Sequence, residues 1–287
     1  MAAVGIVLHH ERPRAVALAG EAVDWLTAHG HEARVPEDDV EVVEAAGLAC
    51  TAAQEFGKGL DLVVSLGGDG TMLRTVDLVT RHDVPVLGVN VGQLGYLTVL
   101  EPAGLVAGLA RFFAGDHGIE ERMTLRVSVE SASGGSDGVE QDCLNEAVLE
   151  KTAPGRTVRL AVDVNGRFFT SYAADGLIVA TPTGSTAYSL SARGPIVSPR
   201  HRALLVTPVA PHMLFDRTLV LDATESVRVE VVDNRAATLS LDGRDLGVLS
   251  GGDAIVCTAG AHAARLVTFG DRDFHDILKA KFGLADR

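Results

Sequence analysis

The chain contains little cysteine. Its 287 residues include only Cys50, Cys143 and Cys257, and no two of these form a Cys-x-x-Cys pair. So few, widely spaced cysteines exclude a disulfide framework and a paired-thiolate zinc site, and they are typical of a reducing compartment. The histidines show no spacing that predicts a metal ligand set. We therefore expect a cytoplasmic protein in which no side chains form a metal site.

Long apolar runs are also missing. A membrane-spanning helix needs about 18 or more consecutive apolar residues. The longest candidate region, residues 85–115, is interrupted by Asn90, Gln93 and Glu101, among others. The first residues show no basic segment followed by an apolar block, so we expect no signal peptide. With 47% hydrophobic and 22% charged residues, the composition is typical of a soluble globular protein.

Basic residues are fewer than acidic residues in this chain. The sequence has 25 Lys and Arg residues against 38 Asp and Glu residues, which gives a formal net charge of −13. This balance argues against nucleic acid or an anionic membrane as the main partner. A phosphate-bearing ligand would therefore need local positive charge or a metal ion at its site.

One short stretch, residues 61–71, organises the chain. The apolar run 62–66 predicts a buried strand, and the spacing of Leu73, Val76 and Val79 predicts a helix after it. Between them, three glycines surround Asp69, so backbone and helix N–H groups could approach a phosphate closely. The turn is neither a P-loop nor a G-x-G-x-x-G fingerprint. The alternative interpretation is that Asp69 is only a helix N-cap.

Strand and helix patterns alternate through the first part of the chain. This alternation predicts a parallel α/β sheet, in which the loop 90–98 lies at the same edge as Asp69. The predicted strands are residues 4–8, 32–35, 62–66 and 84–89, and the predicted helices are residues 13–26, a helix from residue 37, 72–79 and 102–113.

After residues 115–118, strand patterns dominate and predict an all-β, sandwich-like domain. Asn165-Gly166 and Asp242-Gly243 predict tight turns. We expect an α/β domain at residues 1–117, a β-rich domain at 118–270, and a helix within 271–287 that packs on the first domain. The predicted strands of the second domain are residues 126–130, 142–150, 158–164, 168–172, 177–181, 203–207, 227–232, 237–241, 253–257 and 265–269, with a loop at 131–138.

Two stretches of the second domain carry more polar chemistry than folding requires. Asn145 and Glu146 are adjacent in a β segment and cannot both face one apolar side, although strand boundaries often carry such pairs. Six hydroxyl residues fall between Thr181 and Ser191, around Tyr188. Neutral hydrogen-bonding groups beside a flat aromatic ring suit an adenine ring and its ribose. Capping of a short helix by Ser185 or Thr186 would explain one of these hydroxyls.

In this order and at these separations, the turn 67–71, the Asn145-Glu146 pair and the stretch 175–195 resemble the NAD kinase family. The loop 90–98 also looks like the family's loop after the glycine-rich turn. The resemblance covers nearly the whole chain. Lipid kinases and phosphofructokinases share the Gly-Gly-Asp-Gly turn, whereas the stretch 181–188 is much more specific.

The resemblance implies an active site between two domains that transfers a phosphoryl group from ATP or polyphosphate to the 2′-hydroxyl of the adenosine ribose of NAD. Asp69 would be the general base, since a hydroxyl nucleophile needs a carboxylate within hydrogen-bond reach. Mg²⁺, held mainly by the donor's phosphates, would supply charge that the acidic chain lacks. The residues that the resemblance assigns to nucleotide binding are Gly68, Gly70, Thr71, Arg74, Asn145, Glu146, Arg156, Ala173, Asp175, Thr183, Thr186, Ala187, Tyr188, Ser189, Leu190, Ser191 and Arg244.

Two positions depart from the family pattern, because the family usually has Gly at Arg193 and Gln at Arg244. One of these guanidinium groups could reach a phosphate. Two other functions stay open on the sequence alone: a lipid kinase with the same turn, which the acidic surface disfavours, and a silent NAD(P)(H)-binding sensor, which the intact Asp69 disfavours. The family also suggests a homodimer or homotetramer.

Overall fold

The computed structural model describes residues 1–39, 49–132, 140–232, 234–270 and 273–284. The chain divides into two compact units, one formed by residues 1–121 and 263–287 and the other by residues 122–262. No helix of the described residues is long and apolar enough to cross a membrane. The expected helix after Glu37 begins as a 3-10 turn, Glu37–Asp39, and its continuation lies outside the described residues, as does most of the expected loop 131–138.

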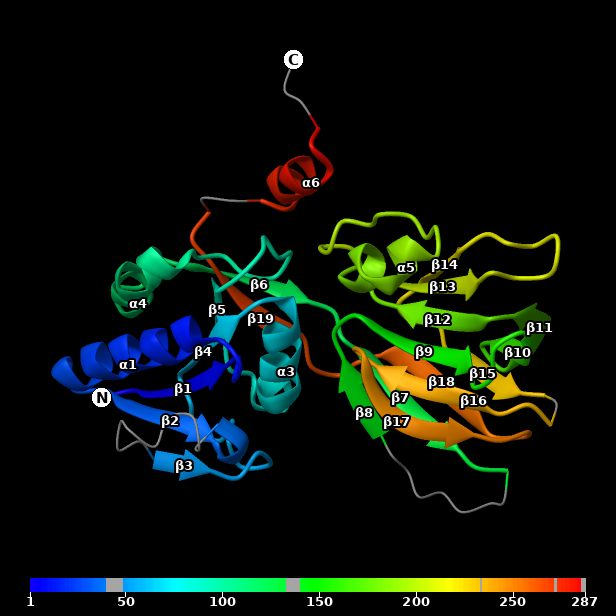
Figure 1. The fold of residues 1–287 in the computed structure, drawn as a ribbon, viewed down its shortest axis with the longest axis horizontal. Coiled ribbons are helices and arrows are strands. Elements are labelled where there is room, and N and C mark those ends of the chain that lie inside the picture. The colour runs from blue at the N-terminus through cyan, green and yellow to red at the C-terminus, as the bar shows by residue number, and fades with distance from the viewer. Residues whose placement is uncertain (40–48, 133–139, 233, 271–272, 285–287) are drawn as a thin grey trace. The chain divides into compact units, whose positions relative to one another are not determined.

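The first unit is built on a mainly parallel sheet (Figure 1). Over the described residues its strand order is β3-β2-β1-β4-β5-β19-β6, and β1, β2, β3, β4, β5 and β19 pair in parallel. The strands are β1 Ala3–Leu8, β2 Glu32–Pro36, β3 Ala49–Thr51, β4 Leu62–Gly67, β5 Val86–Asn90, β6 Gly118–Arg122 and β19 Ala264–Thr268; the helices are α1 Pro13–Ala28, α3 Asp69–Val79, α4 Leu105–Phe113 and α6 Phe274–Phe282, with 3-10 turns at Thr80–His82 and Pro102–Gly104.

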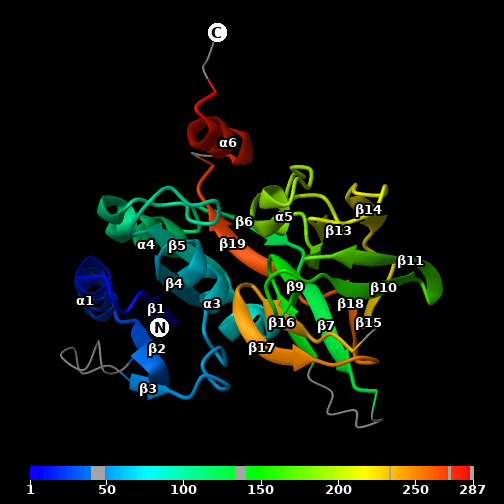
Figure 2. The same cartoon turned by 45° about the vertical axis from the view of Figure 1, so that its right-hand side comes forward.

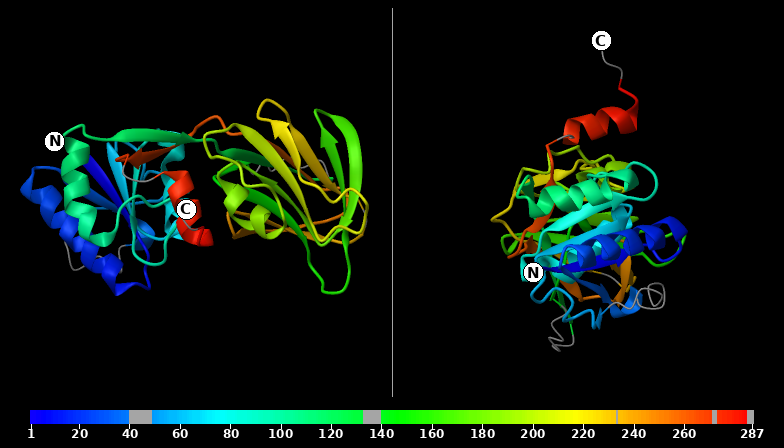
Figure 3. Two further views of the ribbon diagram at one scale, coloured as in Figure 1. Left: turned by 90° about the horizontal axis from the view of Figure 1, so that it is seen from above. Right: turned by 90° about the vertical axis from the view of Figure 1, so that its left-hand side faces the viewer.

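Helices cover both faces of this sheet. Alternate residues of β1 and β4, such as Ile6 and Val64, share one core with α1 and α4, which lie side by side (Figure 3, right). The opposite face carries Ser65, whose hydroxyl accepts a 2.9 Å hydrogen bond from Thr75 of α3. Of the helix face that the sequence predicted, Val76 and Val79 are buried, whereas Leu73 is only half-buried and Met72 takes the buried place beside it. The carboxyl ends of β4 and β5 are therefore free to carry a site.

The second unit is a sandwich of two antiparallel sheets (Figure 2). Over its described residues the sheet orders are β11-β10-β15-β18-β7-β8 and β14-β13-β12-β9-β16-β17, and one core is filled from both sheets. The elements are β7 Leu125–Glu130, β8 Glu140–Cys143, β9 Glu146–Lys151, β10 Val158–Val164, β11 Arg167–Ala174, β12 Gly176–Ala180, the 3-10 turn η5 Gly184–Thr186, α5 Tyr188–Ser191, β13 Ala203–Val209, β14 Leu219–Asp222, β15 Val227–Val231, β16 Ala237–Leu241, β17 Arg244–Leu249 and β18 Ala254–Ala259.

Both predicted hairpin turns are confirmed. Asn165 and Gly166 have φ values of 52° and 71°, and Asp242 and Gly243 have φ values of 48° and 78°. Positive φ at both central residues defines a type I′ turn, which matches the twist of the strands it joins.

The expected second domain, 118–270, needs correction at its end. The predicted strand 265–269 is β19, and it pairs in parallel with β5, with Leu266 opposite Val86. Residues 118–121 likewise belong to the first unit. The apolar pattern marks a strand but not the sheet that the strand joins, which explains the error. The last helix, α6, belongs to the first unit, and Lys281 lies 4.3 Å from the centre of the Tyr96 ring.

Candidate active site

The glycine-rich turn follows the buried strand β4. Gly68 is the N-cap of α3, and Asp69 is the first residue of the helix. A Cβ at Gly67 would come within 2.5 Å of the Thr71 Cβ, so the turn itself requires glycine there. Gly68 and Gly70 have no atoms within 4 Å of the Cβ position, so their backbone is open to a ligand. The first N–H groups of α3 have no partner within the helix and can bind an anion.

Asp69 does not cap the helix, so the N-cap interpretation is wrong. Its carboxylate instead accepts backbone hydrogen bonds from Tyr96 at 2.9 Å and from Leu97 at 3.0 Å. A Cβ at Gly95 would lie 2.9 Å from the Asp69 Cγ, so glycine is needed there to let the loop approach. The predicted meeting of Asp69 with the loop 90–98 is therefore confirmed. Each carboxylate oxygen keeps a second lone pair for another partner.

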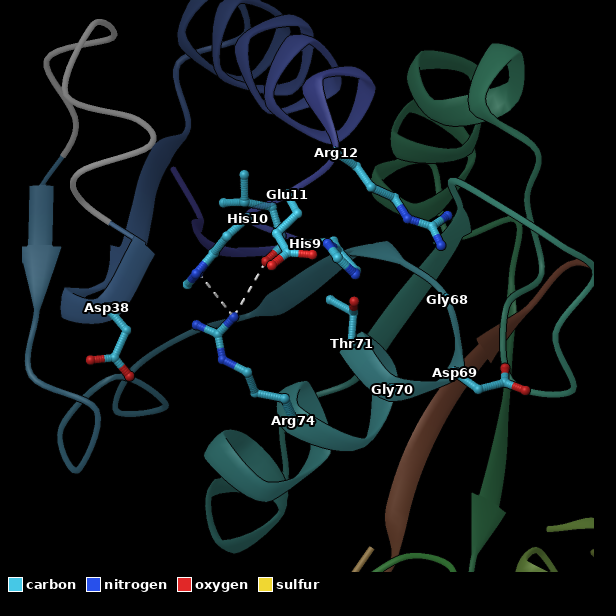
Figure 4. A pocket seen from close by; sticks show the side chains of 11 residues that line it. His9, His10, Glu11, Arg12, Asp38, Gly68, Asp69, Gly70, Thr71 and Arg74 are labelled. Atoms are coloured by element: carbon cyan, nitrogen blue, oxygen red, sulfur yellow. Dashed lines mark hydrogen bonds between the residues drawn. The ribbon is translucent and has the colours of Figure 1, made fainter. Parts of the chain in front are cut away.

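A cavity of about 650 Å³ adjoins this turn (Figure 4). Its lining brings together five of the residues assigned to nucleotide binding or catalysis, all from the first half of α3 and its N-cap, and it adds residues that follow β1. The lining residues are Leu8, His9, His10, Glu11, Arg12, Asp38, Gly68, Asp69, Gly70, Thr71 and Arg74. Arg12 was missed by the sequence analysis, because it precedes a helix proline and resembles an ordinary surface residue.

Two guanidinium groups are fixed at this cavity. Arg12 donates to the backbone carbonyl of Val91, in the loop that also contacts Asp69. Arg74 donates to the Leu8 carbonyl at 3.3 Å and pairs with the fully buried carboxylate of Asp39. They bring two guanidinium groups to the cavity, but Arg74 is paired with Asp39, and Glu11, Asp38 and Asp69 add carboxylates to the same lining. Asp39 carries no sequence signal of this role, because it lies in an acidic run that predicts the start of a helix.

In the second unit, Asn145 lies immediately before β9 and Glu146 is its first residue. Glu146 has 6% of its surface exposed, and the backbone N–H of Tyr188 acts to lower the pKa of its carboxyl. Burial, with a further contribution from Asp242, raises the pKa of Glu146 to about 8. Its Oε2 has no hydrogen-bond partner among the described residues. A buried carboxyl that is protonated at neutral pH can donate a hydrogen bond to a ligand oxygen.

Tyr188, Glu150, Lys151 and Asp175 form one cluster beside this pair. The Tyr188 hydroxyl donates to the Glu150 carboxylate, and Lys151 pairs with Asp175 at 2.6 Å. Burial, followed by the Glu150 hydrogen bond, raises the pKa of Tyr188 to about 12. The tyrosine therefore stays protonated at neutral pH, and its ring orientation is fixed by Glu150. Glu150 was missed because a lone acid in a strand carries no recognisable signal.

The hydroxyl cluster is engaged with the protein more than the sequence suggested. Thr181 donates to the Leu144 carbonyl at 2.6 Å, Thr186 to the Thr183 carbonyl at 3.3 Å, and the hydroxyls of Ser189 and Thr207 are 3.0 Å apart. Ala187 is the N-cap of α5, so the prediction that Ser185 or Thr186 caps this helix is wrong. Ser185 instead donates to the Val197 carbonyl at 3.1 Å. Much of the cluster therefore serves to hold the loop that carries Tyr188.

The remaining assigned residues lie further apart. Arg156 is exposed in the β9–β10 connection, and Arg244 donates to Gln141 at 2.6 Å from the start of β17. The carbonyl of Ala173, in β11, accepts a hydrogen bond from His212 at 2.8 Å. Leu190 and Ser191 end α5, and Arg193 follows with φ of 68°, a left-handed conformation that favours glycine. This conformation fits the glycine that the family resemblance implies at this position.

Comparison with known proteins decides the family. Residues 4–117 match the ATP-NAD kinase N-terminal domain and residues 144–269 match the ATP-NAD kinase C-terminal domain. An NAD kinase of Heliobacterium modesticaldum is 40% identical over 98% of both chains, and one of Citrifermentans bemidjiense is 40% identical over 96% of both. The chain belongs to the NAD kinase family.

Solved structures of NAD kinases share the fold. Yeast NADH kinase in complex with NADH is 26% identical, has a TM-score of 0.90, and is matched over 100% of this chain and 89% of the yeast chain. An Archaeoglobus fulgidus NAD kinase in complex with ATP is 24% identical, with a TM-score of 0.71 over 98% and 97% of the two chains. The resemblance drawn from the motifs is therefore confirmed, and these matches support neither a lipid kinase nor a silent sensor. NAD kinases are phosphotransferases, and this chain is an enzyme of that class.

Proposed function

We propose that the chain transfers the terminal phosphoryl group of ATP or of polyphosphate to the 2′-hydroxyl of the adenosine ribose of NAD, which yields NADP. The observation that carries this proposal is Asp69, fixed by two backbone N–H groups at the edge of a cavity that also holds Arg12 and Arg74. A carboxylate beside a cavity that holds two guanidinium groups suits a reaction in which a hydroxyl attacks a phosphate.

Asp69 is proposed as the general base. Its two backbone partners fix the carboxylate and leave one lone pair on each oxygen free for the attacking hydroxyl. The positively charged side chains and the start of α3 would bind the donor's phosphates. The chemistry fits Mg²⁺ held mainly through those phosphates, since no cluster of three metal-ligating side chains occurs among the described residues.

The test is NADP formation from NAD with ATP and Mg²⁺, with polyphosphate as the alternative donor and NADH as the alternative acceptor. Replacing Asp69 with Asn removes the base and should lower kcat by about 10²-fold or more. Asp77→Asn is the matched control, because Asp77 lies on the exposed side of the same helix. An absence of turnover by the unmodified protein with every donor and acceptor pair would refute the proposal.

We also propose that the chain forms a homodimer or homotetramer in the cytoplasm. Phe168 is 68% exposed on β11, which lies at the edge of its sheet. Leu214 is fully exposed, and the ring of the next residue, Phe215, lies 5.7 Å from the Phe169 ring, centre to centre. Exposed apolar groups of this kind favour an interface between copies of the chain. Light scattering should show smaller particles for Phe168→Ser combined with Leu214→Ser, but not for the control Val248→Ser.

A further inference from the structure

The segment Leu144–Glu146 is held by Asp242, a residue almost one hundred positions further along the chain. Its three backbone N–H groups all donate to the carboxylate of Asp242, which lies in the turn between β16 and β17. The distances are 2.7 Å from Leu144 to Oδ2, 2.7 Å from Asn145 to Oδ1, and 3.1 Å from Glu146 to Oδ1. In return, the Asp242 N–H donates to the Glu146 carbonyl at 3.0 Å.

The turn alone does not require a carboxylate at this position. Asp242-Gly243 and Asn165-Gly166 adopt the same type I′ conformation in the same unit, and asparagine suits that conformation at least as well as aspartate. The carboxylate of Asp242 is therefore explained by the segment that it binds. Hydrogen bonds to an ionised acceptor are about twice as strong as neutral ones.

Thr181 holds the opposite side of the same segment. Its N–H donates to the Asn145 carbonyl at 2.8 Å, and its hydroxyl donates to the Leu144 carbonyl at 2.6 Å. The N–H and the carbonyl of Asn145 thus both have partners in the protein. Only the side chains of Asn145 and Glu146 are left to meet a ligand, and their positions are set by this clamped backbone.

We propose that Asp242 is a positioning residue of the nucleotide site, whose carboxylate fixes the Asn145–Glu146 backbone so that both side chains are placed for a ribose or diphosphate. This inference rests on the proposed function, because it assumes that the pair binds the nucleotide.

The charge of Asp242 has a second effect on the pair. It adds to burial in raising the pKa of Glu146 to about 8, and the N–H of Tyr188 opposes the shift. Among the described residues, Asp242 is the charged group that raises the pKa of Glu146. The pKa of the neighbouring Cys143 thiol is itself raised, mainly by burial and then by Asp242, with smaller contributions from Cys257, Glu146 and Asp142. Glu146 therefore keeps a proton at neutral pH, which it can donate to a ligand oxygen from the side of Oε2.

Asp242→Asn removes the carboxylate but keeps the turn, because an Asn-Gly sequence also favours the type I′ conformation. Asp222→Asn is the matched control, since Asp222 also accepts a backbone N–H, at 2.9 Å from Thr224, in an exposed turn of the same unit. We expect hydrogen exchange of the three amides at 144–146 to accelerate at least about tenfold in Asp242→Asn, as the loss of charged hydrogen bonds implies. The control should keep wild-type protection. Unchanged protection in Asp242→Asn would overturn the proposal.

Calorimetric titration with NAD between pH 6 and 9 tests the link to binding. In the unmodified protein the affinity should fall as pH rises past about 8, the pKa of Glu146. In Asp242→Asn the affinity should weaken about tenfold and the fall should begin at lower pH, because the charge that retains the proton is gone. Glu146→Gln, uncharged at every pH, should show no such fall. A pH profile in Asp242→Asn that matches the unmodified protein would contradict the account.

Two further outcomes are distinguishable. If Asp242→Asn does not fold, Asp242→Glu keeps the charge and both acceptor oxygens, and it should retain the pH profile while losing part of the amide protection. If the unmodified protein binds no NAD, the proposed function fails, whereas the exchange rates of the three amides still decide whether Asp242 positions the segment.

Discussion

Asp69 and Asp242 perform the same structural task in the two units but have different surroundings. Each carboxylate accepts backbone N–H groups from a segment that is distant in sequence, residues 96–97 for Asp69 and residues 144–146 for Asp242. Asp69 also lines a cavity with two guanidinium groups, whereas Asp242 raises the pKa of a buried neighbour. A carboxylate that holds a loop acts as a base only where a reacting group can reach it.

The largest expected effect concerns Glu146, whose pKa is raised by burial and by the charge of Asp242. Because burial raises its folded-state pKa to about 8, the folded protein retains a proton that the unfolded chain releases near its normal pKa of 4.5. The stability that this proton contributes is complete below pH 4.5 and is lost as pH rises through 8, at up to about 1.4 kcal/mol per pH unit. Unfolding measured from pH 5 to 8.5 should show a shallower decline for Glu146→Gln. Parallel curves would contradict the assignment.

Gly95→Ala should disturb the contact between Asp69 and the loop that holds its carboxylate. Its Cβ would lie 2.9 Å from the Asp69 Cγ, so the carboxylate must turn away from the loop although it is chemically unchanged. A displacement of about 1 Å at a reacting group can cost roughly 10²-fold in rate. The control is Gly20→Ala in α1 of the same unit, whose Cβ would meet no atom within 4 Å. Equal kcat values for the two variants would show that the loop does not position Asp69.

A pair of glycine substitutions sharpens the contrast between packing and ligand access. In Gly184→Ala the new Cβ would lie 2.6 Å from the Asn145 carbonyl carbon, and overpacking of this kind costs about 1–3 kcal/mol. Gly70→Ala meets no atom within 4 Å and lies in a helix, where alanine is the better residue. Chemical denaturation should therefore show a loss of stability for the first variant only. Weaker ATP binding by Gly70→Ala would then report on ligand access.

The smallest effect is expected at Arg193, which stands in a left-handed conformation with φ of 68°. Glycine adopts this conformation without strain, so Arg193→Gly should stabilise the protein by up to about 1 kcal/mol. The midpoint of urea denaturation measures the change. The same variant tests whether the guanidinium contacts a phosphate, because unchanged KM values for NAD and ATP would exclude that role.

The sequence predicted most of the local structure, because periodicity and turn chemistry are local signals. The buried strand β4, the helix α3 and both type I′ turns follow directly from short stretches of residues. It could not place β19 in the first sheet, since the alternation of apolar residues is the same in either sheet. Partners that are remote in sequence decide such assignments.

The residues of the candidate site show the same difference between local and long-range signals. Asp69 could be singled out because three glycines surround it. Asp242 gave only a turn signal and Asp39 and Arg12 gave none for a site, since their roles come from contacts across the fold. The hydroxyl cluster, in contrast, carries a strong local signal. Its density suggested ligand binding, but Thr181 and Ser185 bind carbonyls of the protein itself.

The most direct test of the account measures kcat and KM for NAD in Asp69→Asn and Asp242→Asn side by side, with ATP and Mg²⁺ saturating. If Asp69 is the base and Asp242 a positioning residue, kcat falls about 10²-fold or more in the first variant, while in the second KM rises about tenfold and kcat changes little. Turnover by Asp69→Asn at the wild-type kcat, or the same loss of kcat in both variants, would contradict it.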